Sequence, residues 1–153
     1  MNEIINTMSM YIPAKSENES FARSVVAAFC VGLNPTLDEI NDIKTAVSEA
    51  VTNCVVHAYQ KRQSGNDLIK IECKLFPEML EVIISDQGIG ISNISQAMEP
   101  FFTTEPNGER SGMGFTVMQS FMDQISVNNQ NGGGTVVTMK KYFTKDKKEV
   151  CGE

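Results

Sequence analysis

The sequence predicts an α+β fold, a two-layer sandwich in which helices pack on one face of a mixed, largely antiparallel sheet. Two helical patterns come early in the chain, and alternating apolar and polar segments joined by short turns follow them. The most regular helical pattern covers 38–58, and its apolar stripe must face a core. The stripe consists of Ile40, Ile43, Val47, Ala50, Val51, Cys54 and Ala58.

Local signals place the ends of the two early helices. Ser16 and Glu19 form a capping-box pattern before the first helix, and Gly32 suits the position just after it. Thr36 and Glu39 repeat the capping-box pattern at the start of the helix over 38–58.

The remaining elements follow from periodicity. We expect strands at 8–12, 69–75, 80–84, 125–129 and 135–143, the last two joined by a glycine-rich turn at 131–134. A helix is expected over 112–123 with Phe115, Met118 and Met122 inward, and a short one over 93–98. The 153 residues suit one domain, spanning 1–143, with 144–153 as a frayed tail.

Composition narrows the class of protein. The hydrophobic fraction of 41% is ordinary for a globular chain, and a net charge of −6 argues against a nucleic-acid-binding surface. No apolar run approaches the roughly 20 residues of a membrane span, and the first ten residues lack a signal-peptide pattern. We therefore expect a cytoplasmic protein with no nucleic-acid or membrane partner.

The four cysteines form no CxxC pair and have no histidine at ligand spacing. Three of them fall within apolar patterns, which favours buried free thiols over a zinc site or a disulfide framework. The four are Cys30, Cys54, Cys73 and Cys151.

Glu49 and Asn53 lie one turn apart on the helix over 38–58, on a face away from its apolar stripe. Side chains four residues apart stand about 5–6 Å from each other. A carboxylate and a carboxamide held this way suit a general base beside a metal ligand. On this segment alone, the solvated side of an amphipathic helix is the simpler interpretation.

Two glycine motifs add further candidates. Asp86-Gln-Gly88-Ile-Gly90 follows a strand; its glycines let the backbone approach a flat ligand, and its carboxylate can accept from an exocyclic amine. Gly112 and Gly114 directly precede a helix, where free N–H groups favour a phosphate. An ordinary turn and an ordinary helix start are the alternatives, and neither motif is a P-loop or a dinucleotide fingerprint.

The order of these motifs resembles the Bergerat ATP-binding fold, which unites gyrase, the Hsp90 chaperone, histidine kinases and MutL. The family's three boxes match 49–53, 86–90 and 112–114, and PFFTT at 100–104 looks like the phenylalanine box of the kinase branch. Within the superfamily the likeness is strongest to the bacterial anti-sigma serine kinases, in the branch that acts on the sporulation sigma factor sigma F. It covers nearly the whole chain.

The resemblance implies ATP and Mg²⁺ as cofactors. It implies that Asn53 coordinates Mg²⁺, that Glu49 is the general base for a seryl hydroxyl, and that Asp86 accepts from the adenine amine. Other nucleotide contacts are implied for the glycines of the boxes, for the lid and for a late-strand threonine that acts through water. These are Gly88, Gly90, Thr103, Thr104, Arg110, Gly112, Met113, Gly114, Phe115 and Thr135.

The resemblance also implies partners. The family binds a sigma factor and phosphorylates a serine of an anti-anti-sigma protein, and Arg23 matches a residue of the shared partner surface. The family is dimeric, and the strand at 8–12 is a candidate for pairing across a two-fold axis. His57 is the only histidine, and a structural or phosphate-neighbouring role fits it better than phosphate acceptance.

Other functions remain open on the sequence. A plain ATPase switch would use Glu49 to activate water, and a stress-response anti-sigma kinase would act on a different sigma factor. A nucleotide-dependent binding module would transfer no phosphate. A detached histidine-kinase catalytic domain is the weakest alternative, because its partner helices are missing.

Overall fold

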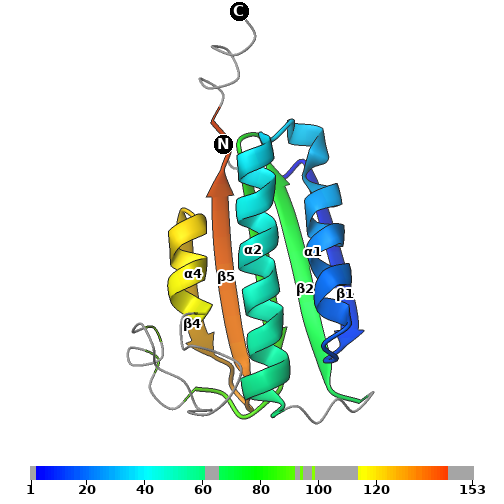
Figure 1. Ribbon diagram of the computed structural model, residues 1–153, viewed down its shortest axis with the longest axis vertical. Coiled ribbons are helices and arrows are strands. Elements are labelled where there is room, and N and C mark those ends of the chain that lie inside the picture. The colour runs from blue at the N-terminus through cyan, green and yellow to red at the C-terminus, as the bar shows by residue number, and fades with distance from the viewer. Residues whose placement is uncertain (1–2, 61–65, 92–93, 95–97, 99–113, 145–153) are drawn as a thin grey trace, which may run out of the picture.

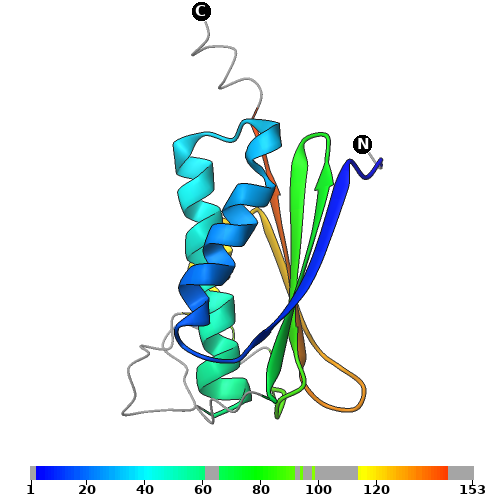
Figure 2. The same ribbon diagram turned by 90° about the vertical axis from the view of Figure 1, so that its right-hand side faces the viewer.

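The computed structural model describes residues 3–60, 66–91, 94, 98 and 114–144. In that part of the chain, three α-helices and one five-stranded sheet form two layers (Figures 1 and 2). The elements are β1 (Asn6–Pro13), α1 (Asn18–Phe29), α2 (Leu37–Asn53), β2 (Leu68–Phe76), β3 (Met79–Asp86), α4 (Gly114–Phe121), β4 (Gln124–Asn129) and β5 (Thr135–Tyr142). The predicted α+β two-layer sandwich is confirmed.

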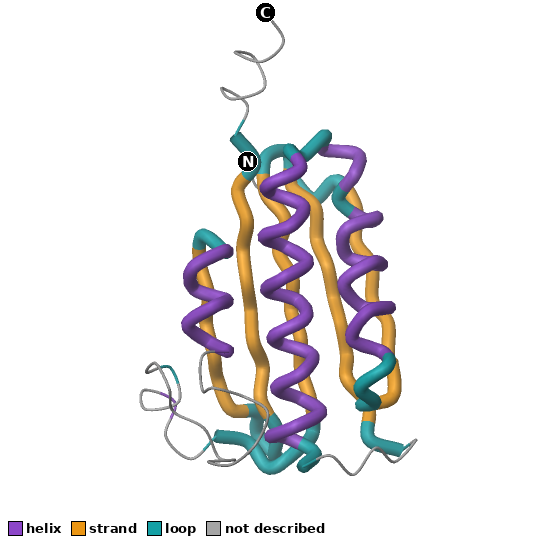
Figure 3. The backbone as a smooth tube through the Cα atoms, viewed as in Figure 1, coloured by secondary structure: helices purple, strands orange, loops and turns teal. Residues whose placement is uncertain are grey.

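The sheet has the strand order β1-β2-β3-β5-β4, and each pairing among the described strands is antiparallel. In this part of the chain the sheet is therefore antiparallel, and not mixed as predicted. Alternation decides which face is covered. Along β2, Ile69, Ile71 and Cys73 are buried, whereas the residues between them are half-buried. The helices lie together on one face, so the other face of the sheet carries the polar half of each strand (Figure 3).

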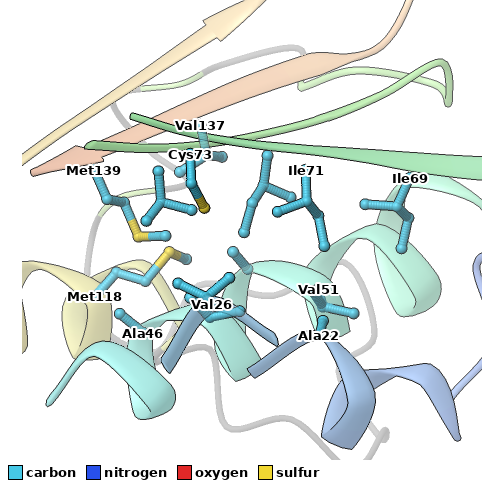
Figure 4. Packing of buried hydrophobic residues seen from close by; sticks show 14 of the residues in the cluster. Ala22, Val26, Ala46, Val51, Ile69, Ile71, Cys73, Met118, Val137 and Met139 are labelled. Atoms are coloured by element: carbon cyan, nitrogen blue, oxygen red, sulfur yellow. The ribbon is translucent and has the colours of Figure 1, made fainter. Parts of the chain in front are cut away.

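The core lies between the two layers. Met118 of α4 and Met139 of β5 approach each other across it, and both are fully buried (Figure 4). Ala22, Val26 and Val51 close the core from the helix side. Each large apolar side chain removed from water in this way contributes about 1.5–3 kcal/mol. The predicted inner face of α4 is therefore confirmed.

The capping box that starts α2 is confirmed. The Glu39 amide donates to Thr36 Oγ1 at 3.1 Å, and Glu39 Oε1 accepts from the Thr36 amide at 2.8 Å. Glu39 Oε2 accepts from both the amide and the hydroxyl of Thr144, each at 3.1 Å. One buried carboxylate therefore joins the start of α2 to the residues that follow β5.

The capping box predicted for α1 is wrong. The N-cap residue is Glu17, whose side chain makes no capping bond. The Glu19 amide donates instead to the backbone carbonyl of Ser16 at 3.2 Å. A backbone turn thus satisfies the donor that the sequence pattern assigned to the Ser16 hydroxyl.

The end of α1 also differs from the prediction. After Phe29 the chain continues through a 3₁₀ turn, Val31–Leu33, and the left-handed residue that ends this turn is Asn34, with φ 52°, rather than Gly32. Asparagine tolerates this conformation because its short side chain can hydrogen-bond locally.

The long helix predicted over 38–58 changes form within its last five residues. Cys54–Ala58 is a π-helical turn, in which the Tyr59 amide donates to the Cys54 carbonyl at 2.9 Å. The wider turn begins directly after Asn53. Such turns occur where tertiary contacts outweigh the α-helical hydrogen bonds, frequently at functional sites.

Lys141 joins three elements inside the fold. Its buried ammonium, carried by β5, donates to Asp42 Oδ2 of α2 at 2.9 Å and to the carbonyl of Phe121, at the end of α4, at 2.7 Å. A cation at a helix C-terminus also interacts favourably with the helix dipole. This contact fixes the position of α4 beside α2.

Several predictions concern residues outside the described ranges. They are the loop at 101–111, most of the short helix at 93–98 and the tail after Thr144. Of that short helix, the Met98 amide donates to the Ile94 carbonyl at 3.1 Å, the spacing of one helical turn. Among the described helices, none combines the length and the apolar character needed to cross a membrane.

Replacing Glu39 with Gln should lower the free energy of unfolding at pH 7 by about 1–3 kcal/mol, because a charged acceptor of several hydrogen bonds is lost. Burial raises the pKa of Glu39, but the bonds from Thr36 and Thr144 outweigh it and hold the pKa below 4.5. Its stabilisation is therefore present above pH 4.5 and is lost as the pH falls through the folded-state pKa. Urea unfolding at several pH values tests this, with the exposed Glu3→Gln as control. If the difference in unfolding free energy between wild type and Glu39→Gln does not become smaller in acid, the prediction is wrong.

Candidate functional site

Four segments meet at one end of the molecule: the end of α2, the end of β3, the start of β5 and the start of α4 (Figure 1, lower end). The antiparallel register brings them together, since β3 runs toward this end and β5 starts from it. The residues predicted as site residues and also described by the structure gather here, apart from Arg23.

Asp86, the last residue of β3, has a buried carboxylate with three donors around it. Oδ1 accepts from the amides of Gly88, at 2.9 Å, and Thr135, at 3.2 Å. Oδ2 accepts from the thiol of Cys54 at 3.5 Å. A carboxylate has about four acceptor positions, so these three donors leave one position on Oδ2 unfilled by the part of the chain that the structure describes.

Burial raises the pKa of Asp86 above 3.8, and the bonds from Gly88, Cys54 and Thr135 offset only part of that effect. Burial also raises the pKa of the Cys54 thiol far above its ordinary value, with Asp86 adding to the shift. The thiol is therefore the donor of this pair, and the carboxylate is the acceptor.

The loop after β3 rests on the π-helical turn. The Ile89 amide donates to the Ala58 carbonyl at 3.1 Å, and the Gln87 amide donates to the Tyr59 hydroxyl at 2.7 Å. That hydroxyl donates to the Leu68 carbonyl at 2.7 Å. A Cβ atom at Gly88 would overlap the backbone of Ala58. The glycine is therefore required by close packing of the two backbones.

The turn before β5 supports the other side of the loop. Gln130 Nε2 donates to the Asp86 carbonyl at 2.6 Å, and a Cβ at Gly134, whose φ is +99°, would overlap that same carbonyl. Gly90 also has a positive φ, 78°. Asn129 bonds both the amide and the carbonyl of Ile91, at 2.8 and 2.7 Å. The main chain of the loop is thus held from both sides, largely by side-chain hydrogen bonds.

Glu49 and Asn53 lie one turn apart in the last turns of α2. Both are half-buried, and Glu49 Oε1 is buried, so this face is covered rather than solvated. A Cβ at Gly114 would stand 3.1 Å from both Oδ1 and Nδ2 of Asn53. The backbone at the start of α4 therefore lies against the Asn53 carboxamide.

Comparison with known proteins decides the family. A model described as the histidine kinase-like ATPase domain matches residues 12–141. The anti-sigma F factor of Clostridium beijerinckii is 55% identical over 138 residues, which cover 90% of this chain and 95% of that protein. The anti-sigma F factor of Thermoanaerobacter sp. is 50% identical over 145 residues, 95% of this chain and 99% of that protein.

The chain belongs to the anti-sigma F factor family. Its histidine kinase-like ATPase domain implies that it binds ATP, in line with an anti-sigma factor built on a kinase-type fold.

Solved structures share this fold at low identity. The RsbU and RsbW domains of Rv1364c from Mycobacterium tuberculosis match with a TM-score of 0.63 and 16% identity, over 90% of this chain and 32% of that one. The catalytic domain of the histidine kinase ThkA matches with a TM-score of 0.57 and 17% identity, over 94% of this chain and 99% of that one.

The other predicted residues of this anti-sigma F factor family member form two groups, those that the structure describes and those outside the described ranges. Thr103, Thr104, Arg110, Gly112 and Met113 lie outside the described residues. The structure describes the rest: Phe115 packs partly buried against the core, and His57 is half-buried in the π-helical turn. Arg23 lies on α1, where Nη1 is 3.3 Å from Ser48 Oγ and 3.5 Å from Glu19 Oε2.

Sequence reasoning did not assign site roles to Cys54, Tyr59, Asn129 or Gln130. Cys54 was expected only as part of the apolar stripe, and it does lie in the core as well. The amide-rich run before the glycine turn was the one local signal for Asn129 and Gln130. Nothing local marked Tyr59, because its hydroxyl bonds backbone groups that only the folded chain brings near.

Gly88→Ala should destabilise the protein by about 2–4 kcal/mol and weaken ATP binding at least tenfold, because the new methyl overlaps Ala58 and displaces the loop. Gly32→Ala is the matched control: an added Cβ meets no atom within 4 Å there, and φ is not positive, so stability should change by less than about 1 kcal/mol. Urea unfolding and calorimetric ATP titration measure both. Wild-type ATP binding in Gly88→Ala would refute the tight-packing account.

Proposed function

We propose that this chain is an anti-sigma factor and protein serine/threonine kinase. It binds the sporulation sigma factor sigma F and uses MgATP to phosphorylate a serine on an anti-anti-sigma antagonist. The observation that carries the proposal is the convergence, at one end of the fold, of a buried carboxylate with one available acceptor position and a Glu–Asn pair beside the start of a helix. The family names of its relatives supply the partner.

The adenine end of the site is assigned to Asp86. Its remaining acceptor position suits the exocyclic amine of adenine. Gly88 and Gly90 bring backbone rather than side chains to the face of the base. Thr135, whose amide already bonds Asp86 at 3.2 Å, supports the base through water.

The phosphate end is assigned to Asn53 and the start of α4. Mg²⁺ prefers oxygen ligands and usually takes one or two from the protein and the rest from phosphates and water, so the Asn53 carboxamide oxygen fits as a ligand. Gly114 and Phe115 begin a helix of eight residues, whose free N–H groups favour a phosphate. Gly112, Met113 and Arg110 are proposed to complete this side, with Thr103 and Thr104 as lid residues.

Glu49 is assigned as the general base. Bound MgATP supplies the phosphoryl group. Glu49 takes the proton of the acceptor seryl hydroxyl as the serine oxygen bonds to the γ-phosphorus, while the bond from that phosphorus to the bridging oxygen of ADP breaks. Its place on α2, one turn before Asn53, holds the base in fixed relation to the metal ligand.

Arg23 is assigned to the surface that contacts both the sigma factor and its antagonist. Its side chain is more than a third exposed, and its contacts with Glu19 of α1 and Ser48 of α2 hold it beside both helices. We further propose a cytoplasmic homodimer, with β1, an edge strand of the sheet, as the pairing element. His57 is assigned a structural or phosphate-neighbouring role.

The decisive experiment mixes the purified chain with labelled ATP, Mg²⁺ and candidate anti-anti-sigma proteins from the same genome. Phosphoserine should form on one of them, and Glu49→Ala should slow its formation by about 10²–10⁴-fold, the usual contribution of a general base. Glu81→Ala, on the uncovered face of the sheet, is the control and should leave the rate unchanged. Calorimetric ATP titration of Glu49→Ala should show binding intact.

Two other results would redirect the assignment. Phosphate released to water with no labelled protein would favour the plain ATPase switch. ATP binding with neither product would favour the nucleotide-dependent binding module.

A further inference from the structure

We propose that Cys54 is a specificity-determining positioning residue of the nucleotide site: its thiol orients the Asp86 carboxylate so that one acceptor position faces the ligand, and this selects a 6-amino purine over a 6-oxo purine. The inference rests on the proposed binding of ATP through Asp86.

The hydrogen bonds around Asp86 carry the argument. The amides of Gly88 and Thr135 both donate to Oδ1, so they restrain one oxygen of the carboxylate. Oδ2 has one protein donor that the structure records, the Cys54 thiol at 3.5 Å. Without the thiol, only the two amide bonds to Oδ1 would limit rotation of the carboxylate. The thiol therefore determines where the open acceptor position of Oδ2 points.

The location of Cys54 makes this contact possible. Cys54 is the first residue of the π-helical turn, directly after Asn53, and its side chain is 5% exposed. The turn that brings Cys54 to Asp86 also carries Ala58, which contacts the loop after β3. The thiol and the loop are thus positioned by the same five residues.

The chemistry of the two purines makes the contact selective. Adenine presents an N–H donor at C6, whereas hypoxanthine presents a carbonyl oxygen there, which an ionised carboxylate repels. The thiol bond also favours the ionised form of Asp86, since it lowers the pKa that burial raises. A carboxyl group that turned freely, or that carried a proton, would accept hypoxanthine more readily.

The test compares the affinities of ATP and ITP, measured by calorimetric titration with Mg²⁺. Wild-type protein should prefer ATP. Cys54→Val removes the donor while filling the space, so no water replaces the thiol. We expect the ATP:ITP affinity ratio to fall about fivefold to tenfold, the effect of losing one ordinary hydrogen bond, because a thiol is a weak donor. Cys54→Ser keeps a donor and should retain most of the preference.

Cys73→Val is the matched control. Cys73 is a fully buried thiol in the middle of β2, remote from the loop after β3, so this change should leave the ATP:ITP ratio unchanged even if stability falls. Urea unfolding of each variant separates a loss of stability from a loss of selectivity, because only the affinity ratio reports the orientation of the carboxylate.

The outcomes separate the two levels of the proposal. A Cys54→Val protein that keeps the wild-type ATP:ITP ratio would overturn the role of the thiol. A wild-type protein that binds ATP and ITP equally would instead overturn the assignment of adenine recognition to Asp86, on which this inference depends.

Discussion

The carboxylate of Asp86, buried at the end of β3, constrains the three elements that surround it. Removing a carboxylate from water is expensive unless donors compensate it, and Asp86 receives two amides and a thiol. Each donor comes from a different element: the loop after β3, the start of β5 and the end of α2. The carboxylate can be held only when these three elements meet, so the geometry of the candidate site is a condition of burying this charge.

The helix α2 serves both the core and the site. Its apolar stripe packs on the sheet, while Asn53 lies against the start of α4 and Glu49 stands one turn before Asn53. At its far end the Glu39 capping box joins it to Thr144, and one turn later Asp42 meets Lys141. Lys141 also bonds the carbonyl of Phe121 at the end of α4. The helix α4 is therefore held beside α2 at its end by Lys141, and its start lies against Asn53.

Much of this arrangement could be predicted from the sequence, because it depends on local periodicity. Alternation located the strands, the stripe of α2 located its buried face, and the Thr36 capping box located its start. The motif order placed Asp86, Glu49 and Asn53 at one site, and the fold brings those segments to one end. The start of α1 was mispredicted because a backbone hydrogen bond to Ser16 took the place of the predicted side-chain cap. Its end was mispredicted because a 3₁₀ turn follows the helix and moves the left-handed residue from Gly32 to Asn34.

The rest could not be predicted, because it depends on contacts between distant segments. The π-helical turn follows from the contacts of Ala58 and Tyr59 with the loop at 87–89, and a helical pattern does not reveal them. Cys54 looked like one more apolar position of the stripe. Its bond to Asp86 joins residues 32 positions apart, and only the packed structure shows it.

The most direct measurement of the central claim is ATP affinity and unfolding free energy for Asp86→Asn. Asparagine keeps Oδ1 for Gly88 and Thr135 but replaces the charged Oδ2 with an amino group, so ATP affinity should fall at least tenfold. The wild-type pKa of Asp86 is raised above 3.8, so its ionisation costs stability as the pH rises through the folded-state pKa. The free energy of unfolding of Asp86→Asn should therefore match that of wild type in acid and should equal or exceed it at pH 7. Retained ATP affinity, or a large loss of stability at pH 7, would contradict the account.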